Sequence, residues 1–259
     1  MRRLVLIAAL CGAALLSAGG AYAEQVQEGD LRISFDGSFS PHALPRDRAV
    51  PIAVSVEGSI STTDGSPPPR LQSISIAVNR QGLVSTRGLP TCPPQRLRQT
   101  SSTTALSRCR GALVGHGRFE AAVEFPGSAP FPVEGEMLAF NSRVGGREAI
   151  LMHIYSRRPI QETAVLVFGI SHRGRGRFGT VFSTTIPKIA AEAGYITGIS
   201  FTFGRRYRFA GAERSFLSAS CSAPPGFYGG YFAFARGSFG FEGGQTLPIV
   251  LTRSCHVRR

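Results

Sequence analysis

Apolar and polar residues alternate along most of the chain, with the two-residue period that is typical of half-buried β-strands. The segments with this pattern lie at 31–39, 50–56, 73–78, 118–125 and 195–203. Further segments are strongly apolar and also favour strands, at 149–155, 164–170 and 231–241. The pattern therefore predicts about a dozen strands.

Clusters of glycine, proline and aspartate separate these runs, as expected when neighbouring strands are joined by tight turns. The clearest turns lie at 64–69, 145–146, 224–226 and 243–244. Helical signal is limited to Pro93 to Arg108, where Thr103 or Thr104 would be the N-cap, and to Pro187 to Ala193. We therefore expect an all-β fold with few short helices. Its architecture would be an antiparallel β-sandwich, built as one large or two stacked sandwich-like units.

The first residues have the pattern of a signal peptide. Arg2 and Arg3 precede an unbroken run of apolar and small residues from Leu4 to Leu16, which is shorter than the roughly 18 residues that span a membrane. An A-x-A cleavage pattern follows at 21–23. We expect a signal peptide over 1–23 and a secreted or cell-envelope protein, with an uncleaved signal anchor as the alternative. We expect no transmembrane span in the mature chain.

The mature chain, 24–259, is long enough for one large β domain or for two smaller ones. An N-terminal β-rich part over 24–90 contains all the aspartates, whereas a main β-sandwich part over 110–259 is richer in phenylalanine and glycine. A cysteine-bounded segment, 91–109, would connect them. The sequence leaves open whether the mature chain forms one domain or two.

Four cysteines remain after removal of the signal peptide: Cys92, Cys109, Cys221 and Cys255. An even number in an exported chain predicts two disulfides, and four cysteines allow three pairings. We favour Cys92–Cys109 and Cys221–Cys255, because each pair closes a short local loop. A zinc site built from the four cysteines is disfavoured, since neither pair has the close spacing of such sites.

Positive charge is the strongest compositional feature. The formal net charge is +13, and loss of Arg2 and Arg3 lowers it by two, to +11. Lys188 is the only lysine, so almost all of this charge is arginine. Guanidinium groups suit carboxylate and phosphate partners, but a GC-rich coding sequence also enriches arginine over lysine. The net charge still favours anionic partners.

Two turn-like segments concentrate this charge, one with Arg173, Arg175 and Arg177, the other with Arg205, Arg206 and Arg208. The first contains a G-x-G-x-x-G pattern at 174–179, but a predicted strand follows it, where a dinucleotide site requires a helix. Solvated hairpin ends are the favoured interpretation of these arginines. Because hairpin loops cluster at the ends of a sandwich, the alternative is one patch for anionic polymers of the cell wall or matrix. Nucleic acid is disfavoured for an exported chain.

Catalytic patterns are weak throughout. The five histidines have no metal-ligand spacing, and His153 lies in an apolar segment typical of a core position. The pairs Glu134/Glu136 and Glu120/Glu124 would point outward from strand faces rather than across a cleft. We predict no cofactor and no metal, and expect a non-catalytic extracellular or envelope protein. The alternative is a secreted hydrolase whose site is assembled from sequence-distant residues.

Several segments also resemble a family of uncharacterised exported proteins of high-GC actinobacteria, which are arginine-rich and contain four cysteines. The similar segments are 89–92, 110–115, 138–141, 178–181 and 215–221. The resemblance implies that the four mature cysteines belong to a shared framework. It implies no activity and no functional residues.

Overall fold

The structure, a computed structural model, describes residues 23–188 and 193–258. The predicted signal peptide lies outside the described residues except for Ala23, and most of the predicted helix over 187–193 lies outside them too. The first strand, β1, begins at Glu24, directly after the predicted cleavage point.

Thirteen of the eighteen described strands form one large sheet. From one edge to the other, the order is β1 (Glu24–Glu28), β2 (Leu31–Ser40), β5 (Ala53–Thr62), β13 (Gly194–Phe203), β8 (Leu113–Val123), β9 (Phe131–Val144), β10 (Arg147–Ser156), β11 (Glu162–Ser171), β12 (Phe178–Thr185), β6 (Leu71–Asn79), β17 (Gly229–Phe241), β18 (Thr246–Val257) and β3 (Ala43–Leu44). All pairs are antiparallel except β18 and β3, which are parallel.

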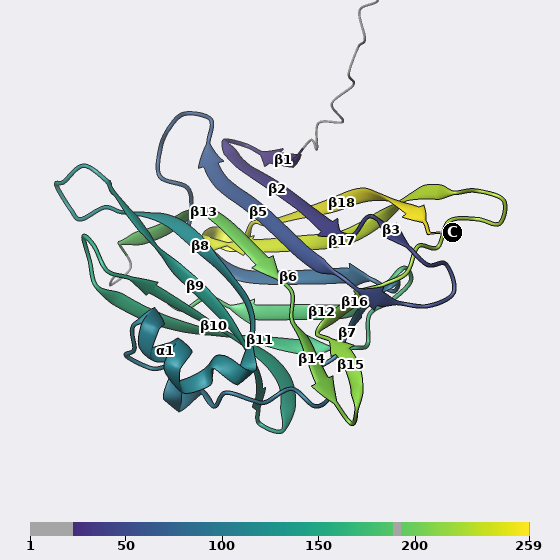
Figure 1. The fold of residues 1–259 in the computed structure, drawn as a ribbon. Coiled ribbons are helices and arrows are strands. Elements are labelled where there is room, and N and C mark those ends of the chain that lie inside the picture. The colour runs from purple at the N-terminus through teal and green to yellow at the C-terminus, as the bar shows by residue number, and fades with distance from the viewer. Residues whose placement is uncertain (1–22, 189–192, 259) are drawn as a thin grey trace, which may run out of the picture.

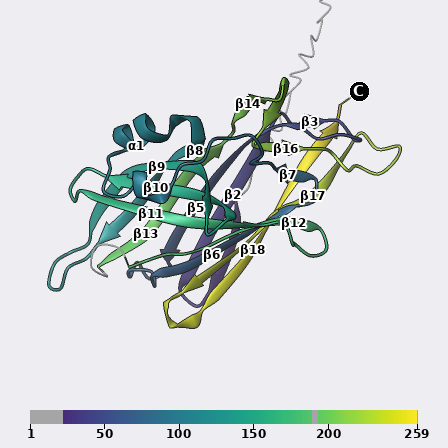
Figure 2. The same ribbon diagram turned by 90° about the horizontal axis from the view of Figure 1, so that it is seen from below.

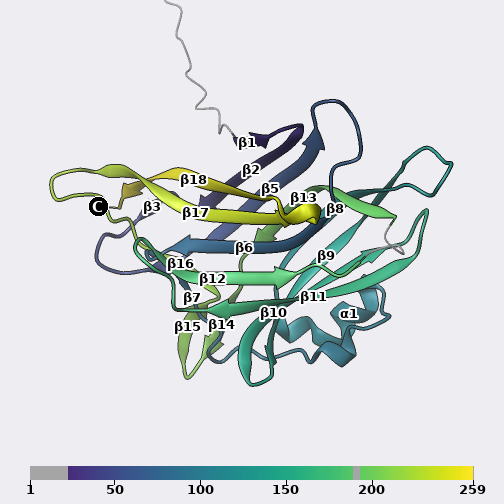
Figure 3. The same cartoon turned by 180° about the vertical axis from the view of Figure 1, so that it is seen from behind.

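This sheet curls around a central interior (Figure 1, Figure 3). Strand twist curves any large sheet, and β-bulges increase the bend. Register shifts of this kind occur in β8, β12, β13 and β17. The predicted predominance of β-structure is confirmed, but the predicted antiparallel sandwich is confirmed only in part. The large sheet is continuous, curled and of mixed direction.

Strand alternation explains the interior. On β2, Leu31, Ile33 and Phe35 face inward and are buried, whereas Arg32 between them is exposed. The same alternation on β6 directs Ile74, Ile76 and Val78 inward. The interior core therefore follows from the two-residue period of the sequence.

Two small sheets lie at one end of the curled sheet. One consists of β4 (Val50–Pro51), β16 (Leu217–Ala219) and β7 (Gly82–Val84), and the other of the hairpin β14 (Arg206–Phe209) and β15 (Ala212–Ser215). At this end β2, β11 and β13 finish, while β12 and β17 begin. We call it the arginine end, because both predicted arginine clusters lie there.

The helix α1 (Ser102–Cys109) covers the outer face of β9 and β10, together with 3-10 turns at Pro94–Arg96 and Arg110–Ala112. A third 3-10 turn lies at Glu242–Gly244. The predicted helical stretch is confirmed, but the predicted N-cap is wrong. Ser101 has extended backbone dihedrals and its hydroxyl accepts from the Thr104 amide, so the helix begins two to three residues earlier.

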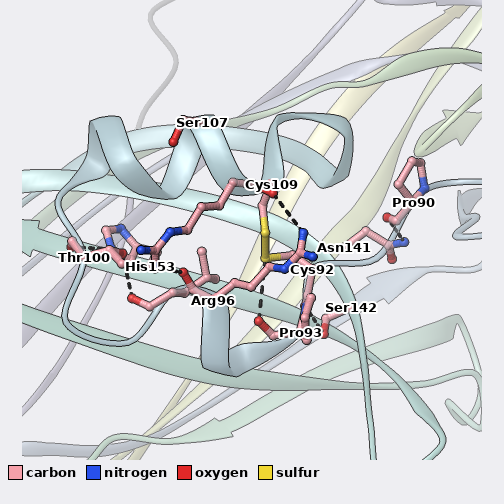
Figure 4. The surroundings of a disulfide bond; sticks show 12 residues. Pro90, Cys92, Pro93, Arg96, Thr100, Ser107, Cys109, Asn141, Ser142 and His153 are labelled. Carbon is pink, nitrogen blue, oxygen red and sulfur yellow. Dashed lines mark hydrogen bonds between the residues drawn. A yellow bond between two sulfur atoms is a disulfide. The ribbon is translucent and has the colours of Figure 1, made fainter.

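Both predicted disulfides are confirmed: Cys92–Cys109 and Cys221–Cys255, with Cα–Cα distances of 5.6 and 5.8 Å. The first attaches the α1 segment to itself above β9, where Ser142 donates to the carbonyl of Cys92 at 2.8 Å (Figure 4). The second joins the start of the 222–228 loop to the end of β18.

Strands from both predicted parts of the mature chain contribute to the same sheet. β6 of the N-terminal part pairs with β12 and β17, and β5 pairs with β13. The division at 91–109 stays a prediction. Among the described residues, no helix combines the length and apolarity needed to span a membrane.

Candidate functional site

The interior of the curled sheet contains a cavity of about 270 Å3. Its lining is almost entirely apolar and comes from strands on all sides, with rings from Phe119, Phe168, Phe182 and Phe201. Packed protein interiors contain few voids larger than a water molecule, and ordinary ligand sites begin at roughly 300 Å3. At about 270 Å3 the cavity lies just below that range, and its apolar lining has the chemistry of a site for a small apolar ligand.

Glycines on neighbouring strands place two of these rings along the wall. A Cβ atom on Gly135 of β9 would lie 2.4 Å from the Phe119 ring of β8. A Cβ atom on Gly117 of β8 would lie 2.6 Å from the Phe201 ring of β13. A Cβ atom at either position would also meet a backbone carbonyl, of Tyr155 or of Ser200, so glycine leaves room for both the neighbouring strand and the ring.

The small β4–β16–β7 sheet covers the cavity at the arginine end. Leu217 and Ala219 of β16 line the cavity together with Val84 of β7. The alternate residue of β7, Leu83, is 53% exposed. Leu83 and Gly82 also belong to the lining, so β7 lies where the cavity approaches the solvent.

Polar side chains border the cavity at both ends. Asn79, Gln81 and Ser220 lie at the arginine end, and Ser156 and Glu162 lie at the opposite end. Ser220 donates to Gln81 at 2.6 Å, and Ser156 donates to the carbonyl of Ile160 at 2.7 Å. An apolar body with polar groups only at its ends matches the distribution of polarity in an amphiphile.

Both predicted arginine clusters lie at the arginine end. The loop between β11 and β12 exposes Arg173, Arg175 and Arg177, and the segment of the β14–β15 hairpin contains half-buried Arg205 and exposed Arg206 and Arg208. In Figure 2 the hairpin and the loop stand apart at this end. The structure thus brings the two clusters to one end of the molecule, and a common binding patch stays a prediction.

The loop between β11 and β12 is fixed to β6. Arg80 donates through Nε to the carbonyl of Gly176 at 2.5 Å and through Nη2 to that of Gly174 at 3.0 Å. The Gly174 amide donates to the carbonyl of Gly179 at 2.9 Å, and Gly176 has a φ of +61°. The G-x-G-x-x-G pattern is therefore a hairpin turn between two strands, without the helix that a dinucleotide site requires.

A polar cluster at the same end was not predicted from the sequence. His172 Nε2 lies 2.9 Å from the Glu148 carboxylate, and His172 Nδ1 lies 3.1 Å from the Thr180 hydroxyl. The Thr86 hydroxyl also donates to Glu148, and this bond lowers the pKa of Glu148 against the opposing effect of burial. No sequence spacing links these residues, so no pattern in the chain could have indicated the cluster.

The order of carboxylate, imidazole and hydroxyl in this cluster is that of a hydrolase triad. Thr180, however, is 5% exposed, and none of Glu148, His172 and Thr180 belongs to the lining of the cavity. A nucleophile must reach its substrate, and this hydroxyl faces neither solvent nor the cavity. The geometry supports a structural role, which is to hold the loop between β11 and β12 against β10.

His153 is fully buried beneath the α1 segment, as the apolar pattern around it indicated. Its Nε2 lies 2.9 Å from the Thr100 carbonyl and 3.1 Å from the Thr100 hydroxyl (Figure 4). Burial lowers its pKa, and the Thr100 carbonyl partly opposes this shift. Its Nδ1 has no hydrogen-bond partner among the described residues.

The predicted carboxylate pairs face away from the cavity. Glu134 of β9 lies opposite Glu120 of β8, and Glu136 lies opposite Arg118, all exposed on the outer face. Within the described part of the chain, no three metal-binding side chains come together. The outward position of these carboxylates separates them from the interior cavity.

No family model, curated protein or solved structure matches this chain. The resemblance to exported actinobacterial proteins therefore stays an expectation, and the function has to be argued from the geometry of the molecule itself.

Proposed function

We propose that this protein is a non-catalytic extracytoplasmic binding protein that holds an apolar ligand in its interior cavity. A single acyl chain, or a molecule with a similar apolar body, matches the site best. The observation that carries the proposal is the cavity of about 270 Å3, apolar along its walls and polar at its two ends. The polar ends would receive the polar group of an amphiphile, while the walls contact its chain.

The loss of stability that an empty cavity would cause supports this proposal. Cavities in protein cores lower stability by roughly 24 cal/mol per Å3, so this one corresponds to about 6 kcal/mol. Whole proteins are stable by only about 5–15 kcal/mol. An empty cavity of this size would therefore cost the protein a large part of its stability. A bound ligand would supply the missing packing contacts.

The extracytoplasmic compartment is part of the proposal and is supported by the cysteines and the N-terminal sequence. The two disulfides are compatible with an oxidising, extracytoplasmic location. Export through the signal peptide at 1–23 is part of the proposal. Mass spectrometry of the exported protein would test it, with Glu24 as the expected first residue.

Titration with cis-parinaric acid, a fluorescent fatty acid, tests the cavity directly. Its emission should rise when it enters the wild-type protein. Ala121→Phe places a ring inside the cavity, because Ala121 lines it, and should weaken binding at least about tenfold. The matched control is Ala122→Phe, since alternate residues of a strand point to opposite faces.

Ala122→Phe should bind the probe as the wild type does. Thermal unfolding of all three proteins shows that loss of binding is not loss of folding. Absence of binding by the folded wild type, or equal binding by both variants, would contradict the proposal.

A second candidate function is binding of anionic polymers of the cell wall or matrix. It is supported by the exposed arginines on the two loops of the arginine end. The two functions are compatible, because one uses the interior and the other the surface.

A further inference from the structure

An exposed aromatic tip projects from the arginine end. The tip consists of Phe227, Tyr228 and Tyr231, whose exposed fractions are 64%, 65% and 84%. Figure 1 and Figure 3 show the loop before β17 extending beyond the C-terminal strand. Single exposed apolar residues are common on protein surfaces, but three large and strongly exposed aromatic side chains in one short segment indicate an interaction surface.

The tip is held rigidly. The Phe227 amide donates to the carbonyl of Pro224 at 3.1 Å, which closes a turn in which Gly226 has a φ of +84°. Arg46 donates through Nη2 to the carbonyl of Phe227 at 2.8 Å. The Cys221–Cys255 disulfide fixes the start of the loop to β18. The side chains are therefore presented to solvent by an ordered backbone, so little conformational entropy is lost when they bind.

Aromatic contacts continue from the tip into the molecule. Phe232, which follows Tyr231, lies with its ring 6.1 Å from that of Phe39 and 6.3 Å from that of Phe234. All three of these phenylalanines line the cavity. The tip thus lies at the end of the molecule where the aromatic wall of the cavity reaches the surface.

Charge is distributed unequally between the two ends. Besides the six arginines already described, the arginine end exposes Arg46, Arg48 and Arg258. It also exposes the carboxylates of Asp47 and Glu213. The opposite end exposes the carboxylates of Glu28, Asp30, Asp64 and Glu124 beside the cations of Arg32, Arg157, Arg158 and Lys188. The molecule therefore carries an electric polarity that orients the aromatic tip toward an anionic surface.

We propose that the arginine end docks on an anionic lipid bilayer, with the aromatic tip entering the headgroup region. Arginines are attracted to anionic headgroups, and tyrosine rings favour the membrane–water interface. An anionic polymer would explain the arginines, but it gives no reason to expose the apolar ring of Phe227. This inference goes beyond the proposed cavity function and does not depend on it.

A tryptophan reporter tests the docking, because the chain has no tryptophan of its own. Phe227→Trp places one at the tip. The matched control is Phe125→Trp, at a phenylalanine that is 44% exposed at the opposite end. With vesicles of three parts phosphatidylcholine to one part phosphatidylglycerol, emission of Phe227→Trp should shift to the blue and be quenched by brominated lipid chains. Emission of Phe125→Trp should not change.

A second measurement separates insertion from simple attraction. In flotation with the same vesicles, replacement of Phe227, Tyr228 and Tyr231 by serine should lower the bound fraction at least about fivefold. Unchanged emission of Phe227→Trp on vesicles that still bind the protein would overturn the proposal in favour of attraction by arginines alone. A blue shift without vesicles that grows with protein concentration would overturn it in favour of a second copy of the chain. Because these assays use no cavity probe, their failure is distinct from failure of the cavity function.

Discussion

His153 is a titratable side chain with no access to solvent, and its surroundings determine its protonation state in the folded protein. Its Nε2 donates to the Thr100 carbonyl at 2.9 Å, while Nδ1 has no partner among the described residues. The carboxylate of Glu136 slightly favours the charged ring, but burial dominates and lowers the pKa of His153. The folded protein therefore holds a neutral imidazole under the α1 segment.

Stability should consequently fall as the pH drops below the ordinary histidine pKa of 6.5. Below that pH the unfolded chain takes up a proton that the folded chain refuses, so unfolding is favoured. Urea unfolding at pH 7.5 and pH 5 measures this loss. His153→Gln keeps a donor for Thr100 but does not titrate, so its loss between the two pH values should be smaller. His116→Gln, at an exposed histidine, should behave as the wild type, and equal pH dependence in all three proteins would contradict the argument.

At the scale of single residues, the sequence indicates which positions are buried but few of their contact partners. The apolar segment around His153 indicated a core residue, because a strand pattern reports burial directly. Its partner Thr100 lies 53 residues away and could not be inferred. Glu148, His172 and Thr180 show the same limit, since their contacts depend on how the strands are ordered in the sheet. The wrong N-cap has a different cause, because Ser101, Thr103 and Thr104 are chemically equivalent caps and only the backbone selects one.

The loop between β11 and β12 contains the arginines of the predicted surface function and is anchored by residues outside it. Arg80 and the His172–Glu148 pair attach it at its two sides, so its shape does not depend on its own arginines. Arg173, Arg175 and Arg177 are therefore available for partners without loss of the turn. Their replacement should change binding while leaving the fold intact.

Replacement of these three arginines by serine should lower the salt concentration at which the protein elutes from an immobilised polyanion. Exposed charges attract the polymer and are screened over about 8–10 Å at physiological salt. The matched control replaces Arg32, Arg157 and Arg158, which are exposed at the opposite end, and removes the same charge. We expect a clearly larger shift for the loop variant. Equal shifts would mean that only net charge matters, and no shift would mean that the loop is only a turn.

Elements with long alternating patterns were predictable, whereas the short ones were not. β2 and β6 each repeat the alternation over nearly their whole length, so the period identifies them. β4, β16 and β7 have two or three residues each, too few for any period. The cover of the cavity is built from these short strands, so the site itself could not be derived from the pattern.

The shape of the whole molecule depends on how the two edges of the large sheet lie relative to each other. Alternation predicts one apolar face per strand but does not distinguish two facing sheets from one curled sheet, because both bury that face. Curling brings β18 beside β1 and β2. Arg253 of β18 bridges this junction: it donates to Glu24 at 2.7 Å, to Asp36 and to the carbonyl of Gly37. The bridge attaches β1 and β2, at one edge of the curled sheet, to β18 near the other edge.

Loss of this bridge should open the junction between β18 and β2. In Arg253→Met the carboxylates of Glu24 and Asp36 remain side by side without their partly buried cation, so we expect a loss of roughly 3 kcal/mol in the free energy of unfolding. Arg253→Lys keeps the positive charge but loses the forked guanidinium group. Its free energy of unfolding should therefore lie between those of Arg253→Met and the wild type. Arg32→Met, at an exposed arginine of β2, is the control and should change stability by less than about 1 kcal/mol. Urea unfolding measures all four proteins. Equal stability of Arg253→Met and Arg32→Met would show that backbone twist alone holds the sheet in its curled form.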